Sequence, residues 1–339
     1  MEKVRIGVVG TGHLGNLHTK MLAQISNVDL VGVFDADAAK AQKVASEHGT
    51  KAYTSLEELL RDIQAVSIAT STTTHYDVAC QALERALHAF IEKPITETIE
   101  QAKRLVVLAK EKNVFIQVGH IERFNPAILA LEQYKIRPLF IESHRLAQFN
   151  PRGSDVAVVL DLMIHDIDLI LSLVKSRVVR VDANGVSVVS GSEDIANARL
   201  QFENGCVANV TASRISQNKM RKMRLFQNDA YISIDFSQGL SEVFRLVDEG
   251  DPNVKPTMML GKIDQGTRKR VIVYEQPEVK EVNALKYELE LFAKSVQDGT
   301  EPPVTGQDGL QALEVAQEIL KEIAANTAYL MGNEKKMDS

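Results

Sequence analysis

The first third of the chain alternates short apolar runs with amphipathic stretches. Runs such as Ala65–Ala69 are apolar on both faces, which indicates strands that are covered on both sides. Because these runs alternate with helical stretches, the pattern predicts a parallel sheet joined by crossover helices. The expected strands are Val4–Val9, Leu30–Phe34, Ala65–Ala69, Ala89–Ile91 and Val114–Val118. The expected helices are Leu14–Ser26, Ala38–His48, Ser55–Arg61, His75–Arg85 and Thr98–Lys112.

After about residue 120 the pattern changes. From Val178 to Tyr274 polar and apolar positions alternate between turn-like segments, which predicts an antiparallel meander. Before the meander we expect a helix after Asn125-Pro126, a strand near Leu139–Leu146 and a long apolar helix at Val156–Val174. After it we expect helices at about Val282–Gln297 and Gly306–Asn326. The fold class is therefore α/β, with a doubly wound parallel sheet followed by an α+β domain.

Length and composition agree with two domains. At roughly 150 residues per domain, 339 residues predict about two, which we place at residues 1–120 (nucleotide-binding) and 121–339 (substrate-binding). A hydrophobic share of 45% and a charged share of 25% are ordinary for a soluble globular chain. The net charge of −6 and the lack of a basic stripe argue against a nucleic-acid partner.

The sequence also predicts the compartment. No apolar run approaches the ~20 residues needed to span a bilayer. Strand-like sequence begins by Val4, which leaves no room for the regions of a signal peptide. Cys80 and Cys206 lie far apart and lack metal-ligand spacing, as is typical of a reducing compartment. We therefore expect a cytoplasmic protein with neither a membrane partner nor a metal.

A glycine-rich loop follows the first strand directly. It consists of Gly10, Thr11, Gly12, His13, Leu14 and Gly15, with the spacing G-x-G-x-x-G. The first glycine allows a tight turn, the second lets a pyrophosphate approach the backbone, and the third packs helix against strand. At the end of the second strand stands Asp35, where an acid accepts hydrogen bonds from ribose hydroxyls. The two features together predict a dinucleotide cofactor; the alternative is a glycine-rich turn and an unrelated acid.

The acid also bears on the type of dinucleotide. Asp35 would repel a 2′-phosphate, and Ala36 follows it where a phosphate binder would place Arg or Ser. Both residues favour NAD over NADP. Lys40 and Lys43 lie nearby and keep NADP open as the alternative.

A charged tripeptide ends the fourth strand. Glu92, Lys93 and Pro94 follow Ala89–Ile91. Ligands of open α/β sheets lie at the carboxyl ends of the strands, so Lys93 is expected at the cofactor cleft. A partly desolvated ammonium there can stabilise a developing alkoxide. The alternative is a solvated lysine that merely follows a strand.

One narrow polar stripe interrupts the apolar helix at Val156–Val174. It consists of Asp161, His165, Asp168 and Ser172, at spacings of four, three and four residues. Buried carboxylates and imidazoles are costly unless they pair, bind a ligand or line a wet cleft. His165 is the candidate general base, with Asp161 to orient it and Asp168 behind them. An internal hydrogen-bond network is the main alternative, and a metal site lacks a further ligand pair.

In combination these motifs resemble the glucose–fructose oxidoreductase/inositol dehydrogenase (Gfo/Idh/MocA) family. The resemblance covers almost the whole chain and rests on Gly10–Gly15, Asp35, Glu92-Lys93-Pro94 and Asp161-x-x-x-His165. It implies a Rossmann domain, then a domain with a large open sheet that forms homodimers or homotetramers. It also implies that Lys93, Asp161 and His165 are catalytic, at the point where a sugar or cyclitol hydroxyl meets the nicotinamide.

One segment departs from the family pattern. The family often shows Thr-Pro-Asn-x-x-His after the third strand, where this chain has Thr70-Ser71-Thr72-Thr73-Thr74-His75. The resemblance implies cofactor contacts from Thr70, Ser71, Thr72, His75, Glu92 and Lys93. The absent Pro and Asn leave the contacts of Ser71 and Thr72 open.

A closer resemblance concerns the substrate. Gly119–Pro126 and Asn150–Asp155 are similar to segments of family members that oxidise the 3-hydroxyl of UDP-N-acetylglucosamine. A sugar-nucleotide substrate is thereby implied, held by Asp161 and His165. Arg123, Arg145 and Arg152 are candidate donors to the diphosphate, because guanidinium groups match phosphate oxygens; they could equally be surface arginines.

Two other functions stay open on the same residues. One is a dehydrogenase of a free sugar or a cyclitol, which would need no nucleotide on its substrate. The other is a non-catalytic NAD-binding regulator, since one scaffold serves several functions. The intact set of Lys93, Asp161 and His165 weighs against a regulator.

Overall fold

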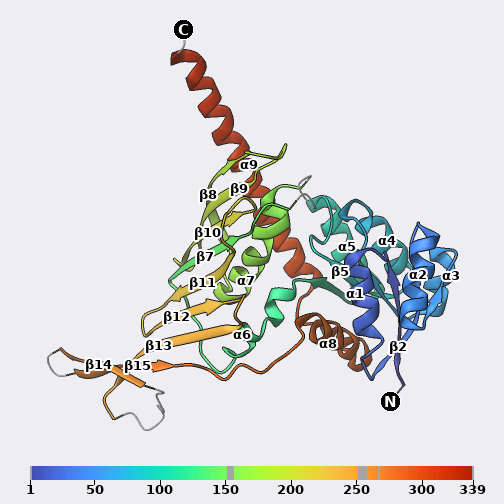
Figure 1. The fold of residues 1–339 in the computed structure, drawn as a ribbon, viewed down its shortest axis with the longest axis horizontal. Coiled ribbons are helices and arrows are strands. Elements are labelled where there is room, and N and C mark those ends of the chain that lie inside the picture. Colours follow the sequence, from blue (N-terminus) through green and yellow to red (C-terminus); the bar gives the residue numbers. More distant parts are fainter. Residues whose placement is uncertain (1, 151–155, 251–257, 266–267, 338–339) are drawn as a thin grey trace. The chain divides into compact units, whose positions relative to one another are not determined.

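The chain forms two compact units. The computed structural model describes residues 2–150, 156–250, 258–265 and 268–337. Unit 1 comprises Met1–Phe124 and Asn283–Glu314, and unit 2 comprises Asn125–Val282 and Val315–Ser339. Each unit has its own sheet and its own core (Figure 1).

Unit 1 is built on a six-stranded parallel sheet with the strand order β3-β2-β1-β4-β5-β6. Its strands are β1 (Val4–Val9), β2 (Val28–Phe34), β3 (Lys51–Ala52), β4 (Ala65–Ile68), β5 (His88–Glu92) and β6 (Ile116–Gly119). Its crossover helices are α1 (His13–Leu22), α2 (Ala38–His48), α3 (Leu56–Asp62), α4 (Thr72–Glu84) and α5 (Ile99–Lys112). The predicted doubly wound fold is confirmed; only the two-residue strand β3 was not predicted. β4 is buried at every position, as a sheet covered on both faces requires.

Local capping explains where these helices begin and end. Thr98 and Gln101 form the capping box that their spacing predicts at the start of α5, and Asn113 ends that helix in a left-handed conformation. The side chain of Asp37 accepts hydrogen bonds from the first turn of α2, and Gly49 ends α2 at φ 66°. Short-range polar contacts therefore suffice to fix these boundaries.

A segment from the end of the chain completes unit 1. Helix α8 (Ala284–Asp298) contributes Leu289, Phe292 and Ala293 to the same core as Ile6 of β1. The rings of Phe292 and Phe90 meet edge to face with centroids 5.8 Å apart. The division at residue 120 places this segment with the second half of the chain. The structure differs because the apolar face of α8 covers the first sheet, a long-range contact that periodicity cannot reveal.

Unit 2 contains a nine-stranded sheet with the order β14-β15-β13-β12-β11-β7-β10-β9-β8. Its strands are β7 (Phe140–Leu146), β8 (Val178–Val186), β9 (Ile195–Phe202), β10 (Val207–Ser213), β11 (Met220–Phe226), β12 (Ala230–Asp235), β13 (Leu240–Asp248), β14 (Met258–Gln265) and β15 (Arg268–Glu275). The prediction of a mainly antiparallel sheet is confirmed. The simple meander is wrong in two places. β7 inserts between β10 and β11 and pairs parallel with β10, and β13 pairs with β15 while β14 lies at the edge.

The two faces of the unit 2 sheet differ. Ile141, Ser143 and Arg145 of β7 are buried on the face against which α7 (Ile164–Val174) packs. The opposite face carries a row of half-buried aromatic rings. The remaining helices in the described part of the chain are η1 (Ile121–Phe124) in unit 1, α6 (Pro126–Leu129) and η2 (Val159–Met163) in unit 2, and α9 (Gly306–Met337), which begins in unit 1 and continues in unit 2. In the part of the chain that the structure describes, no helix combines the length and apolar character that a bilayer crossing requires.

The place of α8 in the unit 1 core is testable. Phe292→Ala should lower the free energy of unfolding by about 3–5 kcal/mol, because it opens a cavity in that core. Phe149→Ala is the control: it removes the same ring from a residue that is 47% exposed, and it should lower the free energy of unfolding by no more than about 0.5 kcal/mol. Urea denaturation followed by circular dichroism measures both. Equal costs would show that α8 is not part of the core.

Candidate active site

The predicted cofactor residues of unit 1 gather at one edge of its sheet. Gly10 follows β1, Asp35 follows β2, and Lys93 follows β5. Thr70 lies just beyond the end of β4. Because these strands are parallel, their carboxyl ends share an edge, and the strand order reverses between β1 and β4, where open α/β sheets bind ligands.

The three glycines of the loop meet three different demands. Gly10 has φ 89°, and a Cβ there would lie 2.7 Å from the carbonyl oxygen of Ala69. A Cβ on Gly15 would lie 1.7 Å from the carbonyl oxygen of Gly10, so the helix can approach the strand only without a side chain. A Cβ on Gly12 would meet nothing within 4 Å. The open space at Gly12 lets a ligand approach the protein backbone. Helix α1 begins there with no acidic residue in its first turn, so nothing repels an anion.

Asp35 has a structural partner that the sequence did not indicate. Its Oδ2 accepts hydrogen bonds from the backbone N–H of Thr11 (2.6 Å) and from the Thr11 hydroxyl (3.0 Å). Its Oδ1 accepts one from the N–H of Asp37 (2.9 Å). The carboxylate therefore holds the glycine loop in place. His13 and Leu14 are exposed at the start of α1.

The hydroxyl-rich segment after β4 begins helix α4. The hydroxyl of Thr74 donates to that of Thr70 (2.8 Å), Ser71 is the exposed N-cap, and Thr72 is half-buried. His75 is buried, and its ring nitrogens lie 3.0 Å from the carbonyl oxygen of Pro94 and 3.2 Å from that of Thr70. Burial lowers the pKa of His75 below its ordinary value. His75 thus contacts two backbone carbonyls at this edge of the sheet, and its contact with the cofactor stays a prediction.

Lys93 is half-buried and stands beside a buried carboxylate. Its backbone N–H donates to Oε2 of Glu92 (3.3 Å). Oε1 of Glu92 lies 2.9 Å from Nε2 of His18, a fully buried residue of α1 that the sequence motifs missed. Desolvation would raise the pKa of Glu92, but the hydrogen bond from His18 and the charge of Lys93 hold it below its ordinary value. Glu92 is thus an internal anion, and cofactor contact by its side chain stays a prediction.

Asp161 and His165 lie in unit 2 on a helix with an irregular start. The expected helix at Val156–Val174 is α-helical only from Ile164, because Val159–Met163 forms a π-helix that contains Asp161. A π-helix closes its hydrogen bonds over five residues instead of four. Such turns occur often at functional sites. Lys93 lies in unit 1, and the meeting of the three residues in one cleft stays a prediction.

The rest of the polar stripe is internal. Asp168 is fully buried, and the hydroxyl of Ser172 donates to the carbonyl oxygen of Leu169 (2.7 Å). Asp166, which the sequence reasoning passed over, forms a buried bidentate pair with Arg145 of β7: Nε lies 3.1 Å from Oδ2, and Nη2 lies 2.7 Å from Oδ1. The fork of Arg145 is therefore occupied. It ties α7 to β7, and a contact of Arg145 with a diphosphate stays a prediction.

The other two candidate arginines have different fates. Nη2 of Arg123 lies 3.3 Å from Oδ1 of Asp308, and its side chain is only 15% exposed. Desolvation would raise the pKa of Asp308, but Arg123 and Thr305 hold it below its ordinary value. Arg123 thus ties η1 to the start of α9 within unit 1. Arg152 lies outside the described residues.

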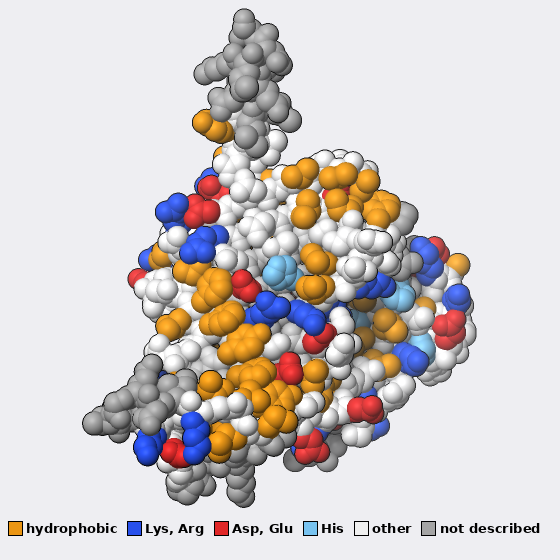
Figure 2. Space-filling model, turned by 60° about the vertical axis from the view of Figure 1, so that its left-hand side comes forward, with side chains coloured by type: hydrophobic (Ala, Val, Ile, Leu, Met, Phe, Trp, Pro, Cys, Tyr) orange, Lys and Arg blue, Asp and Glu red, His pale blue; other side chains and the backbone are white. Residues whose placement is uncertain are grey.

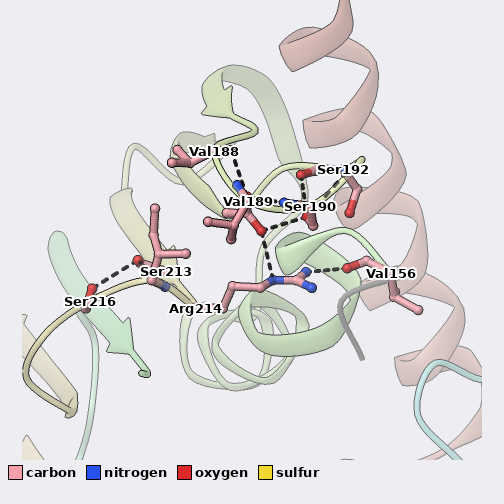
Figure 3. Close-up of polar contacts among 10 residues, drawn as sticks. Val156, Val188, Val189, Ser190, Ser192, Ser213, Arg214 and Ser216 are labelled. Carbon is pink, nitrogen blue, oxygen red and sulfur yellow. Dashed lines mark hydrogen bonds and ion pairs between the residues drawn. The ribbon is translucent and has the colours of Figure 1, made fainter. Parts of the chain in front are cut away.

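Another buried carboxylate, that of Asp194, fixes the backbone that leads into the π-helix (Figure 3). Oδ2 of Asp194 accepts hydrogen bonds from the N–H groups of Val188, Val189 and Ser190, and Oδ1 accepts one from the Ser190 hydroxyl. Desolvation would raise the pKa of Asp194, but these hydrogen bonds hold it far below its ordinary value. Nε of Arg214 lies 3.8 Å from Oδ1, and its Nη2 donates to the carbonyl oxygen of Val156. The backbone just before the helix that carries Asp161 is therefore anchored.

Comparison with known proteins identifies the family. Residues 4–120 match the model of the oxidoreductase family with an NAD-binding Rossmann fold (GFO_IDH_MocA), and residues 141–239 match the GFO/IDH/MocA C-terminal domain. A UDP-N-acetylglucosamine 3-dehydrogenase from Acidithiobacillus ferrooxidans is 42% identical over 245 residues, which are 72% of this chain and 78% of that protein. The chain belongs to the Gfo/Idh/MocA oxidoreductase family.

Relatives within this family extend the likeness to the whole chain. The solved structure of the Acidithiobacillus dehydrogenase superposes with a TM-score of 0.86 at 35% identity, covering 96% of this chain and 99% of that one. The scyllo-inositol 2-dehydrogenase (NAD(+)) of Bacillus subtilis is 28% identical over 99% of this chain and 97% of its own length. A levoglucosan dehydrogenase solved with NADH shares the fold at 20% identity, with a TM-score of 0.79.

The glycine loop offers a sharp test of cofactor binding. Gly12→Ala should leave the melting temperature nearly unchanged, because its methyl group meets no atom of the chain, but it should weaken NAD binding by filling the space for the pyrophosphate. Gly15→Ala is the matched variant and should destabilise the fold, because its methyl group would strike the Gly10 carbonyl. Thermal unfolding and calorimetric titration with NAD⁺ separate the two effects. Undiminished NAD affinity in Gly12→Ala would place the cofactor elsewhere.

Proposed function

We propose that this oxidoreductase uses NAD to oxidise the 3-hydroxyl of UDP-N-acetylglucosamine to a ketone. The observation that carries the proposal is the likeness to the Acidithiobacillus enzyme of that name, which extends over both units. The same likeness favours a sugar nucleotide over a free sugar. A cytoplasmic location stays a prediction.

The edge of the unit 1 sheet fits the cofactor. The open space at Gly12 and the N-terminus of α1 would receive the pyrophosphate, and Asp35 would receive the adenosine ribose. The negative charge of Asp35 would repel a 2′-phosphate, which supports NAD over NADP. Bound NAD⁺ would accept the hydride from the substrate carbon.

The residues of the chain would handle the proton and the charge. His165 takes the proton of the substrate hydroxyl as general base, and Asp161 orients its ring. The ammonium of Lys93 stabilises the negative charge that develops on the substrate oxygen. The half-buried setting of Lys93 and the π-turn around Asp161 support these roles.

A cyclitol dehydrogenase is the second candidate. The scyllo-inositol 2-dehydrogenase of B. subtilis and a myo-inositol 2-dehydrogenase of Thermotoga maritima match over more than nine tenths of the chain, at 28% and 26% identity. Such an enzyme would use the same catalytic residues and would not need the nucleotide part of a substrate.

The substrate can be tested with purified protein and NAD⁺. NADH absorbance should rise with UDP-N-acetylglucosamine and stay flat with free N-acetylglucosamine and with myo-inositol. A glutamate-dependent aminotransferase that removes the ketone should be present, because oxidation of an alcohol by NAD⁺ is often uphill. A signal with a free polyol would support the cyclitol reading instead.

The catalytic roles have their own test. His165→Ala should lower kcat by about 10²–10⁴, the usual contribution of a general base. Lys93→Ala should also lower kcat while the Kd for NAD stays nearly unchanged. His88→Ala, at the opposite end of β5 from Lys93, is a control that should keep its turnover. Full activity in His165→Ala, or loss of NAD binding in Lys93→Ala, would contradict the assignment.

We also propose that the open face of the unit 2 sheet forms a homodimer or homotetramer. Phe140, Phe226, Tyr231, Phe244 and Tyr274 form a row across this face, with neighbouring ring centroids 5.0–5.6 Å apart. All five side chains are half-buried in the single chain. Figure 2 shows hydrophobic side chains gathered over this sheet. A contiguous apolar surface of this kind is typical of a protein–protein interface.

Light scattering coupled to size exclusion tests the assembly. The wild-type protein should have two or four times the mass of one chain. Tyr231→Glu places a charge in the middle of the aromatic row and should give monomers, because a buried unpaired charge is costly. Val107→Glu, at an exposed position of α5, is the control and should keep the wild-type mass. A monomeric wild-type protein would contradict the proposal.

A further inference from the structure

A row of three polar side chains, Ser67, His18 and Glu92, crosses the core of unit 1 and ends at the candidate active site. His18 lies on the inner face of α1 with no exposed surface, beside Leu22 and edge to face with Phe90 at 5.4 Å. Its Nδ1 lies 2.8 Å from the hydroxyl of Ser67 in β4. Its Nε2 lies 2.9 Å from Oε1 of Glu92, at the end of β5.

The partners of His18 define which of its ring nitrogens carries the hydrogen. A carboxylate cannot donate a hydrogen, so in this 2.9 Å contact the hydrogen is on Nε2 of His18. Nδ1 can then accept from the hydroxyl of Ser67, which is both donor and acceptor. The contact between Nε2 and Glu92 is close but lacks the alignment of a regular hydrogen bond, so it acts as a short electrostatic contact.

The carboxylate of Glu92, at the end of this row, has little freedom to move. A Cβ on Gly119 of β6 would come within 2.9 Å of Oε1 of Glu92, so the carboxylate lies against bare backbone. Its Oε2 accepts the N–H of Lys93 (3.3 Å). Beyond Lys93, the ring of His75 lies 3.0 Å from the carbonyl oxygen of Pro94. Two histidines from different helices thus contact the residues on the two sides of Lys93: His18 the side chain of Glu92, and His75 the backbone carbonyl of Pro94.

A row of buried polar side chains stabilises a core no better than apolar packing does. Hydrogen bonds offset the desolvation cost of buried polar groups, but replacing all partners by apolar side chains of the same shape is often neutral or stabilising, and an apolar side chain on α1 would pack between Leu22 and Phe90. Stability of unit 1 therefore gives no reason for it. The effect of the row is instead to fix the carboxylate of Glu92 next to Lys93.

We propose that His18 is a positioning residue of the active site, which holds the Glu92 carboxylate in place and through it sets the position of Lys93. The inference rests on the proposed catalytic role of Lys93. Ser67 supports His18 from the other side, and its contribution is the smaller one because it touches neither Glu92 nor Lys93.

The pH dependence follows from the groups that act on Glu92, which are His18 from α1, His75 from α4 and Lys93 beside it. Burial alone would raise the pKa of Glu92, and the hydrogen bond from His18 is the largest effect that lowers it. Without that donor the pKa of Glu92 must rise, so the carboxylate becomes protonated at a higher pH. Lys93 would then lose its neighbouring anion as the pH falls.

Two isosteric variants isolate the contact. In His18→Gln the side-chain amide nitrogen takes the place of Nε2 and can still donate to Glu92. In His18→Asn it takes the place of Nδ1, so the contact with Ser67 can persist and the one with Glu92 is lost. Circular dichroism spectra and the Kd for NAD should be close to wild type in both variants.

Turnover and its pH profile should distinguish the two. His18→Asn should lower kcat roughly 10- to 100-fold, as expected for a misplaced catalytic group, with the acid limb of the profile moved to higher pH. His18→Gln should recover most of the activity and the wild-type profile. A purely structural histidine would instead give equal losses in both variants, with wild-type profiles, and that result would overturn the proposal.

A second measurement does not depend on the substrate. In protein labelled with ¹³C at the glutamate carboxyl groups, the Glu92 resonance is assigned by its absence in Glu92→Gln. It should titrate at a higher pH in His18→Asn than in the wild-type protein and in His18→Gln. An unchanged titration in His18→Asn would overturn the proposal. A wild-type protein that oxidises no sugar nucleotide would sink the proposed function alone, because this titration would still decide the role of His18.

Discussion

The parallel pairing of β1 with β2 on one side and β4 on the other is the constraint on which the site of unit 1 depends. Parallel strands end at the same edge, so the loop after β1, Asp35 after β2 and Lys93 after β5 lie along one edge however far apart they are in the sequence. The loop fits at that edge because a side chain on Gly15 would collide with the Gly10 carbonyl. Everything proposed about cofactor binding follows from this geometry.

Three buried carboxylates fix the backbone around the proposed catalytic residues. Glu92 with His18 lies beside Lys93, Asp166 with Arg145 ties α7 to β7, and Asp194 with Arg214 anchors the backbone before the π-turn. A buried pair of this kind adds little net stability, because desolvation offsets the attraction, yet the loss of one partner typically costs about 3–5 kcal/mol. Their common effect is that each segment has one defined position.

Much of unit 1 could be predicted because its signals are short-range. The capping box of Thr98 and Gln101, the apolar strand Ala65–Ile68 and the glycine spacing each depend on residues within a few positions of one another. The same holds for the helix at Ala38–His48, which the structure confirms to the residue. The long-range events were not predictable from such signals. The addition of α8 to the first core and the insertion of β7 beside β10 join segments that are far apart in the sequence.

The sequence by itself determined the class of fold and the family, and it placed the predicted cofactor residues at one edge of the first sheet, because strand periodicity and motif spacing are local properties. Only the tertiary structure decided which partner each charged side chain takes. Arg145 and Arg123 have the residue type of phosphate ligands, yet they pair with Asp166 and Asp308. His75 lies in a segment that contacts the cofactor in the family pattern, yet here its ring nitrogens lie against the backbone carbonyl oxygens of Pro94 and Thr70. Residue type fixes what a side chain can bind, whereas burial and distance, which depend on the whole chain, fix what it does bind.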